Sequence, residues 1–292
     1  HMRNNNGVHL AVTCHTRRIH GHVFVTYPLC YNSGMHTRNR NISIALIAFT
    51  LIIIGAWYLS GANKKSSALL PLAQLPLATS SSEVLLRDGE EYTLTASMVR
   101  KVVNGEEVRM LAYNGSIPGP TLRVAQGAEV KIRFVNDIDS GSTVHSHGVR
   151  LDNAFDGVPG VTQPLVMPGE SFEYTIKFPD AGVYWYHPHF DEPYEQMMGL
   201  YGNFIVTPQD GAYWSPVNRE IPITLGDILI GSDGQPVPFT KGRTDHTLMG
   251  RYGNVLLTQG TTDYKLTAKK GEVVRLYLTN VANATPFNFT VP

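Results

Sequence analysis

The sequence has no excess of charge of either sign. Its 292 residues carry 24 Lys plus Arg and 24 Asp plus Glu, so the formal net charge is zero. No basic field indicates a nucleic-acid partner, and no acidic excess indicates a solvating tail. Apolar residues make up 42% of the chain, which is enough to build hydrophobic cores and excludes a disordered protein.

Cysteine is almost absent: the chain has only Cys14 and Cys30, both near the amino terminus. A metal site there would combine them with three nearby histidines: His15, His20 and His22. The spacing matches no zinc-binding pattern, so such a site is conceivable but unsupported. The segment shows neither helical nor strand periodicity, and we expect residues 1–41 to be a disordered tail.

One long apolar run, Ile42 to Leu59, carries no charged side chain and is just long enough to cross a bilayer as a helix. It could be a retained transmembrane anchor or a cleaved signal segment. If translation begins at Met35, a short basic stretch precedes the run and cleavage after Ala62 would fit a signal peptide. In both cases we expect the rest of the chain to be extracytoplasmic, in the periplasm or at the cell surface.

After this run the sequence changes from a linker to short strands. Residues 60–82 are rich in Ser, Ala, Leu and Pro without any repeat, which is typical of a linker. From Glu83 onward, short alternating runs are separated by Gly, Pro, Asn and Asp. In "AEVKIRFVND", for example, apolar residues alternate with charged ones, as in a strand with one buried face. This pattern predicts an all-β fold, a sandwich or barrel.

The second part of the strand-rich sequence repeats the first. "AKKGEVVRLYLTNVAN" at 268–283 has the same pattern as "VAQGAEVKIRFVND" at 124–137, with an offset of about 145 residues. We therefore predict two related domains, residues 83–208 and 209–292. The second copy ends in what should be the middle of a sheet, which would leave strands unpaired. We expect a chain truncated at Pro292 or completed by a partner.

Histidine is scarce beyond the linker, and four of the five residues form two His-x-His pairs: His145 with His147, and His187 with His189. Both stretches, "VHSHGV" and "YWYHPHF", have strand character. Residues i and i+2 of a strand lie on one face about 6.5 Å apart, so each pair offers two imidazoles side by side. Imidazole is a common ligand of copper, zinc and iron, with a metal–nitrogen bond of about 2 Å. Two such strands together favour a site for two neighbouring metal ions.

Three stretches between Tyr113 and Val206 resemble the first cupredoxin domain of a multicopper oxidase, the family of laccases and bacterial copper-tolerance oxidases. They are "YNGSIPGPTLRVAQGAEVKIRFVN", "HSHGVRLDNAFDGVPGVTQPLVMPGESFEYTIKF" and "AGVYWYHPHF" followed by "MMGLYGNFIV". The resemblance implies cupredoxin-like Greek-key domains. It also implies that His145 ligates a type 2 copper and that His147, His187 and His189 ligate the type 3 pair. The second series resembles the second domain, which binds no copper in three-domain members.

The resemblance further implies an exported oxidoreductase that couples oxidation of a phenolic or low-valent metal-ion substrate to reduction of dioxygen to water. In the family, a carboxy-terminal cupredoxin domain supplies four more ligands and the type 1 copper with its cysteine. No Cys follows Cys30 here, and no such domain precedes Pro292. We therefore expect half of a trinuclear copper site, and little or no oxidase activity from this chain alone.

Two other classes of function stay open. The chain could be a copper-binding module without turnover, alone or assembled with a partner, or a structural cupredoxin whose histidines are vacant. Copper nitrite reductase, a near relative, fits less well because it carries a Cys where Pro188 stands. Copper content separates the vacant cupredoxin from the others, and oxygen uptake with a phenolic donor separates the oxidase from the binding module.

Other residues near the histidines have weaker indications of function. Candidates for proton supply are three acidic residues that are better explained as ordinary loop carboxylates: Asp152, Asp156 and Asp191. Met197 and Met198 could bind Cu(I), but we expect them to pack in the sheet. Trp185 is expected to pack beside the histidine strand, and His246 to be solvated in a loop.

Overall fold

The computed structural model of the protein describes four ranges: residues 17–19, 22–24, 70–239 and 250–290. The chain divides into two compact units, residues 1–66 and 67–292. In the first, strand β1 (Arg17–Ile19) pairs antiparallel with β2 (His22–Phe24), a pairing that the sequence did not predict.

No helix in the described ranges is long and apolar enough to cross a membrane. The apolar run 42–59, predicted as a helix, lies outside the described residues, as do Cys14 and Cys30.

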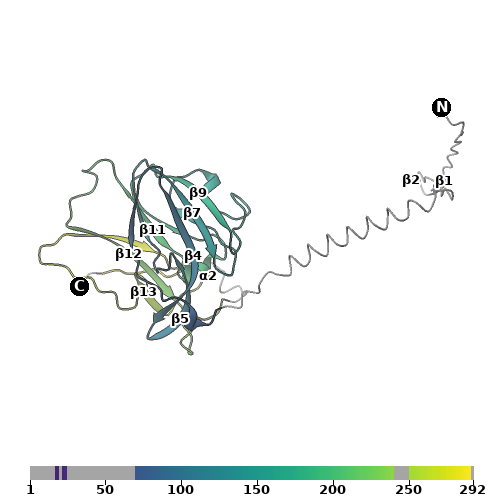
Figure 1. Ribbon diagram of the computed structural model, residues 1–292. Coiled ribbons are helices and arrows are strands. Elements are labelled where there is room, and N and C mark those ends of the chain that lie inside the picture. Colours follow the sequence, from purple (N-terminus) through teal and green to yellow (C-terminus); the bar gives the residue numbers. More distant parts are fainter. Residues whose placement is uncertain (1–16, 20–21, 25–69, 240–249, 291–292) are drawn as a thin grey trace, which may run out of the picture. The chain divides into compact units, whose positions relative to one another are not determined.

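The second unit is built almost entirely from strands, in agreement with the predicted all-β fold (Figure 1). One sheet has the order β5-β4-β7-β9: β4 (Glu91–Val103), β5 (Glu106–Tyr113), β7 (Glu129–Asp137) and β9 (Ser171–Lys177). Another has the order β3-β6-β11-β10-β8: β3 (Glu83–Leu86), β6 (Thr121–Ala125), β8 (His145–His147), β10 (Gly182–His187) and β11 (Gly202–Thr207).

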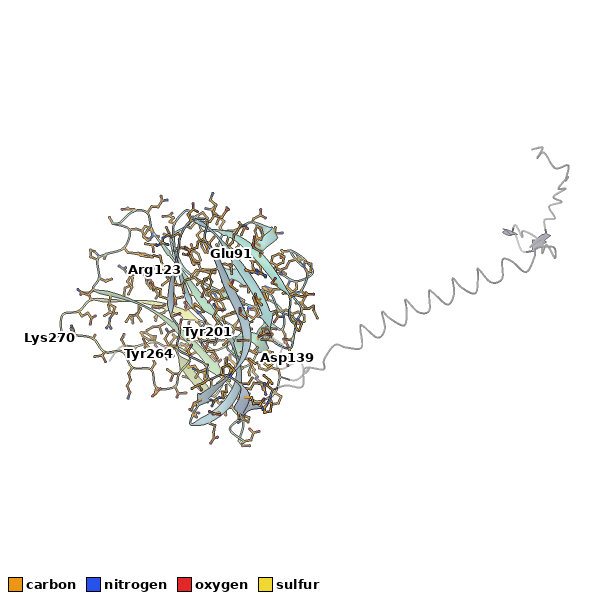
Figure 2. All side chains as sticks on the ribbon, in the orientation of Figure 1. Glu91, Arg123, Asp139, Tyr201, Tyr264 and Lys270 are labelled. Atoms are coloured by element: carbon orange, nitrogen blue, oxygen red, sulfur yellow. The ribbon has the colours of Figure 1, made fainter. Side chains whose placement is uncertain are left out.

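The hydrophobic core lies between these two sheets. In β7, Ile132 and Phe134 are buried while Lys131 and Arg133 between and beside them are exposed, as the alternating sequence predicts. Tyr113 of β5 reaches across to β10, where its ring centroid lies 5.3 Å from that of Tyr186. Side chains fill the space between the sheets (Figure 2), and this packing fixes β10, one of the two strands that carry the histidines.

Part of the predicted linker packs against the first sheet. It contains a short 3-10 helix, η1 (Leu72–Gln74), and Leu75, which is buried. The N–H of Ala78 donates to the carbonyl of Arg100 in β4 at 2.8 Å. Residues 70–82 therefore belong to the folded unit, because buried apolar contacts and paired backbone groups hold a segment whose composition alone indicates flexibility.

A third sheet reproduces the pairing of the first. Its order is β13-β12-β14: β12 (Arg219–Ile228), β13 (Val255–Thr258) and β14 (Val274–Asn280). Strand β12 pairs antiparallel with β13 and parallel with β14, as β4 does with β5 and β7.

A shared turn strengthens the relation between the two sheets. Asn114 follows β5 and Gln259 follows β13, both with a left-handed backbone (φ 49° and 51°). Their side-chain oxygens accept from the N–H groups of Thr95 and Thr224, at 2.7 Å and 2.9 Å. These matching features agree with the internal repeat expected from the sequence.

Candidate metal centre

The two histidine strands are neighbours at one edge of the five-stranded sheet. Edge strand β8 pairs antiparallel with β10, and the register places His145 opposite His187 and His147 opposite Trp185. Directly opposed residues on an antiparallel pair project to the same face, where their side chains lie close together. The pairing thus gathers residues from positions about forty apart in the sequence.

His189 reaches the cluster by a different route from the one predicted. Strand β10 ends at His187, so the prediction that the second stretch is strand throughout is wrong beyond this residue. Pro188 has no N–H to continue the ladder, and the chain turns into helix α2 (Glu192–Met197). The N–H of His189 donates to Thr143 Oγ1 at 3.3 Å, which ties this turn to the segment that enters β8.

All four imidazoles converge. The ring centroid of His145 lies 5.6, 5.4 and 5.2 Å from those of His147, His187 and His189. The potential ligand atoms of His145, His147 and His187 all lie within 4.8 Å of one another. Nδ1 of His147 is 3.3 Å from Nε2 of His187, close enough for both nitrogens to face a common site.

Backbone carbonyls orient two of the rings. Nδ1 of His145 donates to the carbonyl oxygen of Asp156 at 2.6 Å, and Nδ1 of His187 donates to that of Pro188 at 2.8 Å. A carbonyl only accepts, so in each ring Nδ1 carries the proton and Nε2 keeps its lone pair for a metal. Such outer hydrogen bonds are the usual way in which proteins orient ligating histidines.

A glycine allows the carbonyl of Asp156 to come this close. Gly157 has a left-handed backbone (φ 79°), and a Cβ placed on it would lie 2.0 Å from the carbonyl oxygen of Val144. A side chain at this position would therefore push the loop away from the strand that begins at His145.

Burial favours the neutral form of two of the histidines, His187 and His147. It lowers the pKa of His187 to about 3, with a smaller contribution from neighbouring His145. Burial also lowers the pKa of His147, followed by the effects of His145 and His189. Neutral imidazole is the form that ligates metals, and a set of nitrogen donors suits copper. The residues present therefore fit copper ions.

Trp185 packs beside the histidines, as expected from the sequence. Its ring stacks on that of His187 at a centroid distance of 4.1 Å and lies 5.1 Å from that of His147. The indole thus covers one side of the cluster and restricts the motion of two rings.

The three acidic candidates have different environments. Asp152 caps the 3-10 helix η2 (Asn153–Phe155) by accepting from the N–H of Ala154 at 2.9 Å. Asp156 is the one beside the cluster, with Oδ1 3.4 Å from Nδ1 of His145. Asp191 is exposed at the start of α2.

Met197 and Met198 are buried in the core at the end of α2. The prediction that they pack in the sheet is therefore wrong. The apolar sequence around them has the composition of a strand, whereas the turn after His189 starts a helix that ends only at Met197. His246 lies outside the described residues.

Sequence reasoning missed Glu195, on the inner side of α2. Its side chain is fully buried. Its Oε2 accepts from Ser142 Oγ at 2.6 Å, and its Oε1 accepts from Ser140 Oγ at 3.3 Å. Burial raises the pKa of this carboxyl to about 8, although the two serine hydrogen bonds act in the opposite direction. No sequence pattern indicated that this glutamate is internal.

Comparisons with known proteins agree with this geometry. The sequence model of a family described as multicopper oxidase matches residues 95–211, a range that includes all four histidines. Multicopper oxidase mco of Staphylococcus aureus is 34% identical over 209 residues, which cover 68% of this chain and 44% of that protein. Copper resistance protein A of Escherichia coli is 25% identical over 245 residues, 81% of this chain and 37% of that protein.

A solved structure is similar as well. The crystal structure of a multi-copper oxidase from Pseudomonas thermotolerans superposes with a TM-score of 0.61 at 33% identity, over 69% of this chain and 48% of that chain. This chain thus spans less than half the length of each of these three relatives.

Proposed function

Because this chain belongs to the multicopper oxidase family, we propose that its four clustered histidines hold copper ions that take part in dioxygen reduction. The convergence of the four rings, with centroids 5.2 to 5.6 Å from that of His145, is the observation that carries the proposal. By family resemblance, His145 would ligate a type 2 copper, and the other three histidines would ligate a type 3 pair. The four together form half of a trinuclear site.

The activity that fits such a site is that of an oxidoreductase. A phenolic compound or a low-valent metal ion would be oxidised in one-electron steps, and dioxygen would be reduced to water. Bound copper would supply the electron transfer. The residues of this chain supply neutral nitrogen donors, carbonyls that fix two ring tautomers, and an indole that restricts access from one side.

One observation favours a second candidate function for these 292 residues by themselves: copper binding with little or no turnover. A thiolate ligand gives blue copper sites their electron-transfer character. The chain has no cysteine after Cys30, and the described strands hold none. A partner or further sequence would then have to supply the electron-entry site.

We also infer that the strand-rich unit works outside the cytoplasm. The support is the uncharged run from Ile42 to Leu59, which suits either a signal segment or an anchor. Fractionation of cells that express the full chain tests this, because export predicts the protein in the periplasmic or surface fraction and its absence from the cytosolic one.

Copper content tests the central proposal. The full chain is loaded with Cu(II), freed of excess metal and analysed for copper, next to a variant with alanine at all four histidines. We expect the variant to lose the copper of the cluster, while a control with serine at Cys14 and Cys30 keeps it. Equal copper in the wild type and the four-alanine variant would refute the site. Oxygen uptake with a phenolic donor or Fe(II) then separates oxidase from binding module.

A further inference from the structure

Glu195 connects the two segments that carry the histidines. Ser142, its partner at 2.6 Å, lies three residues before His145. Thr143, the next residue, accepts from the N–H of His189 at 3.3 Å. Two adjacent hydrogen bonds therefore join the segment entering β8 to the segment leaving β10, one at His189 and the other at Glu195 of α2.

The surroundings of Glu195 suit a neutral carboxylic acid. Its partners Ser142 and Ser140 are hydroxyl groups, which can both donate and accept and so can pair with a protonated carboxyl. The charged groups that act on it, Asp191 at the start of α2 and Asp139 in the loop after β7, are both acidic. Asp139 lies at the end of the unit where α2 is found (Figures 1 and 2). An ionised carboxylate buried here would be repelled by these charges.

Two tyrosines also interact electrostatically with Glu195, and both stay neutral in the pH range in which Glu195 titrates. Burial raises the pKa of Tyr113, from β5, well above its usual value, and the charge of Glu195 raises it further. Burial likewise raises the pKa of Tyr194, on α2 itself, with smaller contributions from Asp139 and Glu195. Neither tyrosine therefore carries a charge that acts on an ionised Glu195.

We propose that Glu195, through its hydrogen bond to Ser142, is a positioning residue that keeps His189 in register with His145 and His147. This inference rests on the proposed copper function, because its effect is on metal affinity. The two serine hydrogen bonds favour an ionised Glu195, but burial opposes the charge more strongly. We therefore expect ionisation to draw Glu195 toward water, so that α2 moves away from the segment 140–143 and His189 moves with α2. Outer-shell partners of metal ligands typically change metal affinity about 10- to 100-fold when they are lost.

The test measures Cu(II) affinity of the full chain against a competing chelator between pH 6.5 and 9. The variants are Glu195→Gln, which keeps the shape and hydrogen bonds without a titratable group, and Glu195→Ala, which removes them. Glu173→Gln on β9, an exposed partner of Lys131, is the matched control. Copper bound by the four-alanine variant is subtracted as background.

We expect wild-type affinity to fall about tenfold between pH 7 and 9, whereas Glu195→Gln holds its affinity and the control follows the wild type. Glu195→Ala should bind copper about 10- to 100-fold more weakly at pH 7. A Glu195→Gln profile identical to that of the wild type would overturn the inference, as would wild-type affinity in a folded Glu195→Ala protein. If the wild type binds no histidine-dependent copper, the proposed function fails first and the inference fails with it.

Discussion

At the scale of single residues, the histidines and Glu195 differ in how far the sequence reveals them. The i, i+2 spacing of His145 and His147 is enough to predict two rings on one face of a strand. The burial of Glu195 depends on Ser142, which lies 53 residues away in the chain. A lone glutamate beside polar neighbours is usually solvated, so only the fold shows that this one is internal.

Glu195 also makes the stability of the metal-free protein depend on pH. Its pKa rises from an ordinary 4.5 to about 8 in the folded state. Between these pH values the folded protein keeps a proton that the unfolded chain has released. The associated stability is fully present below pH 4.5 and is lost as pH rises through 8, by an amount on the order of 3 to 5 kcal/mol.

We therefore predict that urea denaturation of the metal-free protein gives a decreasing free energy of unfolding from pH 5 to 8.5, and that Glu195→Gln flattens this decrease. The variant should be more stable than the wild type at pH 8 and no more stable at pH 5. Parallel curves for the two proteins would show that the carboxyl titrates normally.

At the scale of elements, most strands follow from alternation, but the loops around the cluster do not. Strand β7 shows the predicted pattern of buried and exposed residues. Helix α2 was not predicted, because its six residues are too few for a helical period to appear in the sequence. It also determines where His189 and Glu195 lie, so local pattern alone could not complete the site.

The loop after β8 offers a paired test of how the ring of His145 is oriented. Gly157 and Gly160 both have left-handed backbones (φ 79° and 74°), yet a Cβ would collide with Val144 only at Gly157, and nothing lies within 4 Å at Gly160. Gly160→Ala should cost about 1 to 2 kcal/mol from backbone strain alone. Gly157→Ala should cost more and also lower copper affinity, because it displaces the carbonyl of Asp156.

Thermal unfolding and copper titration of the two glycine variants provide the measurement. Equal copper affinity in both, with both folded, would show that the carbonyl of Asp156 is not needed to orient His145.

At the scale of the whole molecule, the repeat in the sequence has a counterpart in the pairing of two strands. The matching sequence at 124–137 and 268–283 corresponds to β7 and β14, which pair in the same way within their sheets. The sequence did not show how the two sheets meet. That contact uses individual polar pairs, such as Asn203 with Thr279 Oγ1 at 2.6 Å, whose positions follow no periodic pattern.

The amino-terminal cysteines and histidines are the alternative metal donors in the chain, although their spacing matches no known metal-binding pattern. Cys14 and Cys30 are close in sequence to His15, His20 and His22, and of these five residues only His22, the first residue of β2, is among the described ones. Sulfur ligands favour Cu(I), whereas the four-histidine cluster offers only nitrogen. Sulfur bound to copper would therefore indicate the amino-terminal cysteines, whereas a shell of nitrogen alone would indicate the four-histidine cluster.

X-ray absorption at the copper edge of the loaded full chain tests the central claim most directly. We predict a nitrogen shell at about 2.0 Å with the outer-shell scattering of imidazole rings, and its loss when His145, His147, His187 and His189 are replaced by alanine. A dominant sulfur shell at about 2.3 Å, or an imidazole signal unchanged in that variant, would contradict the assignment of copper to these four histidines.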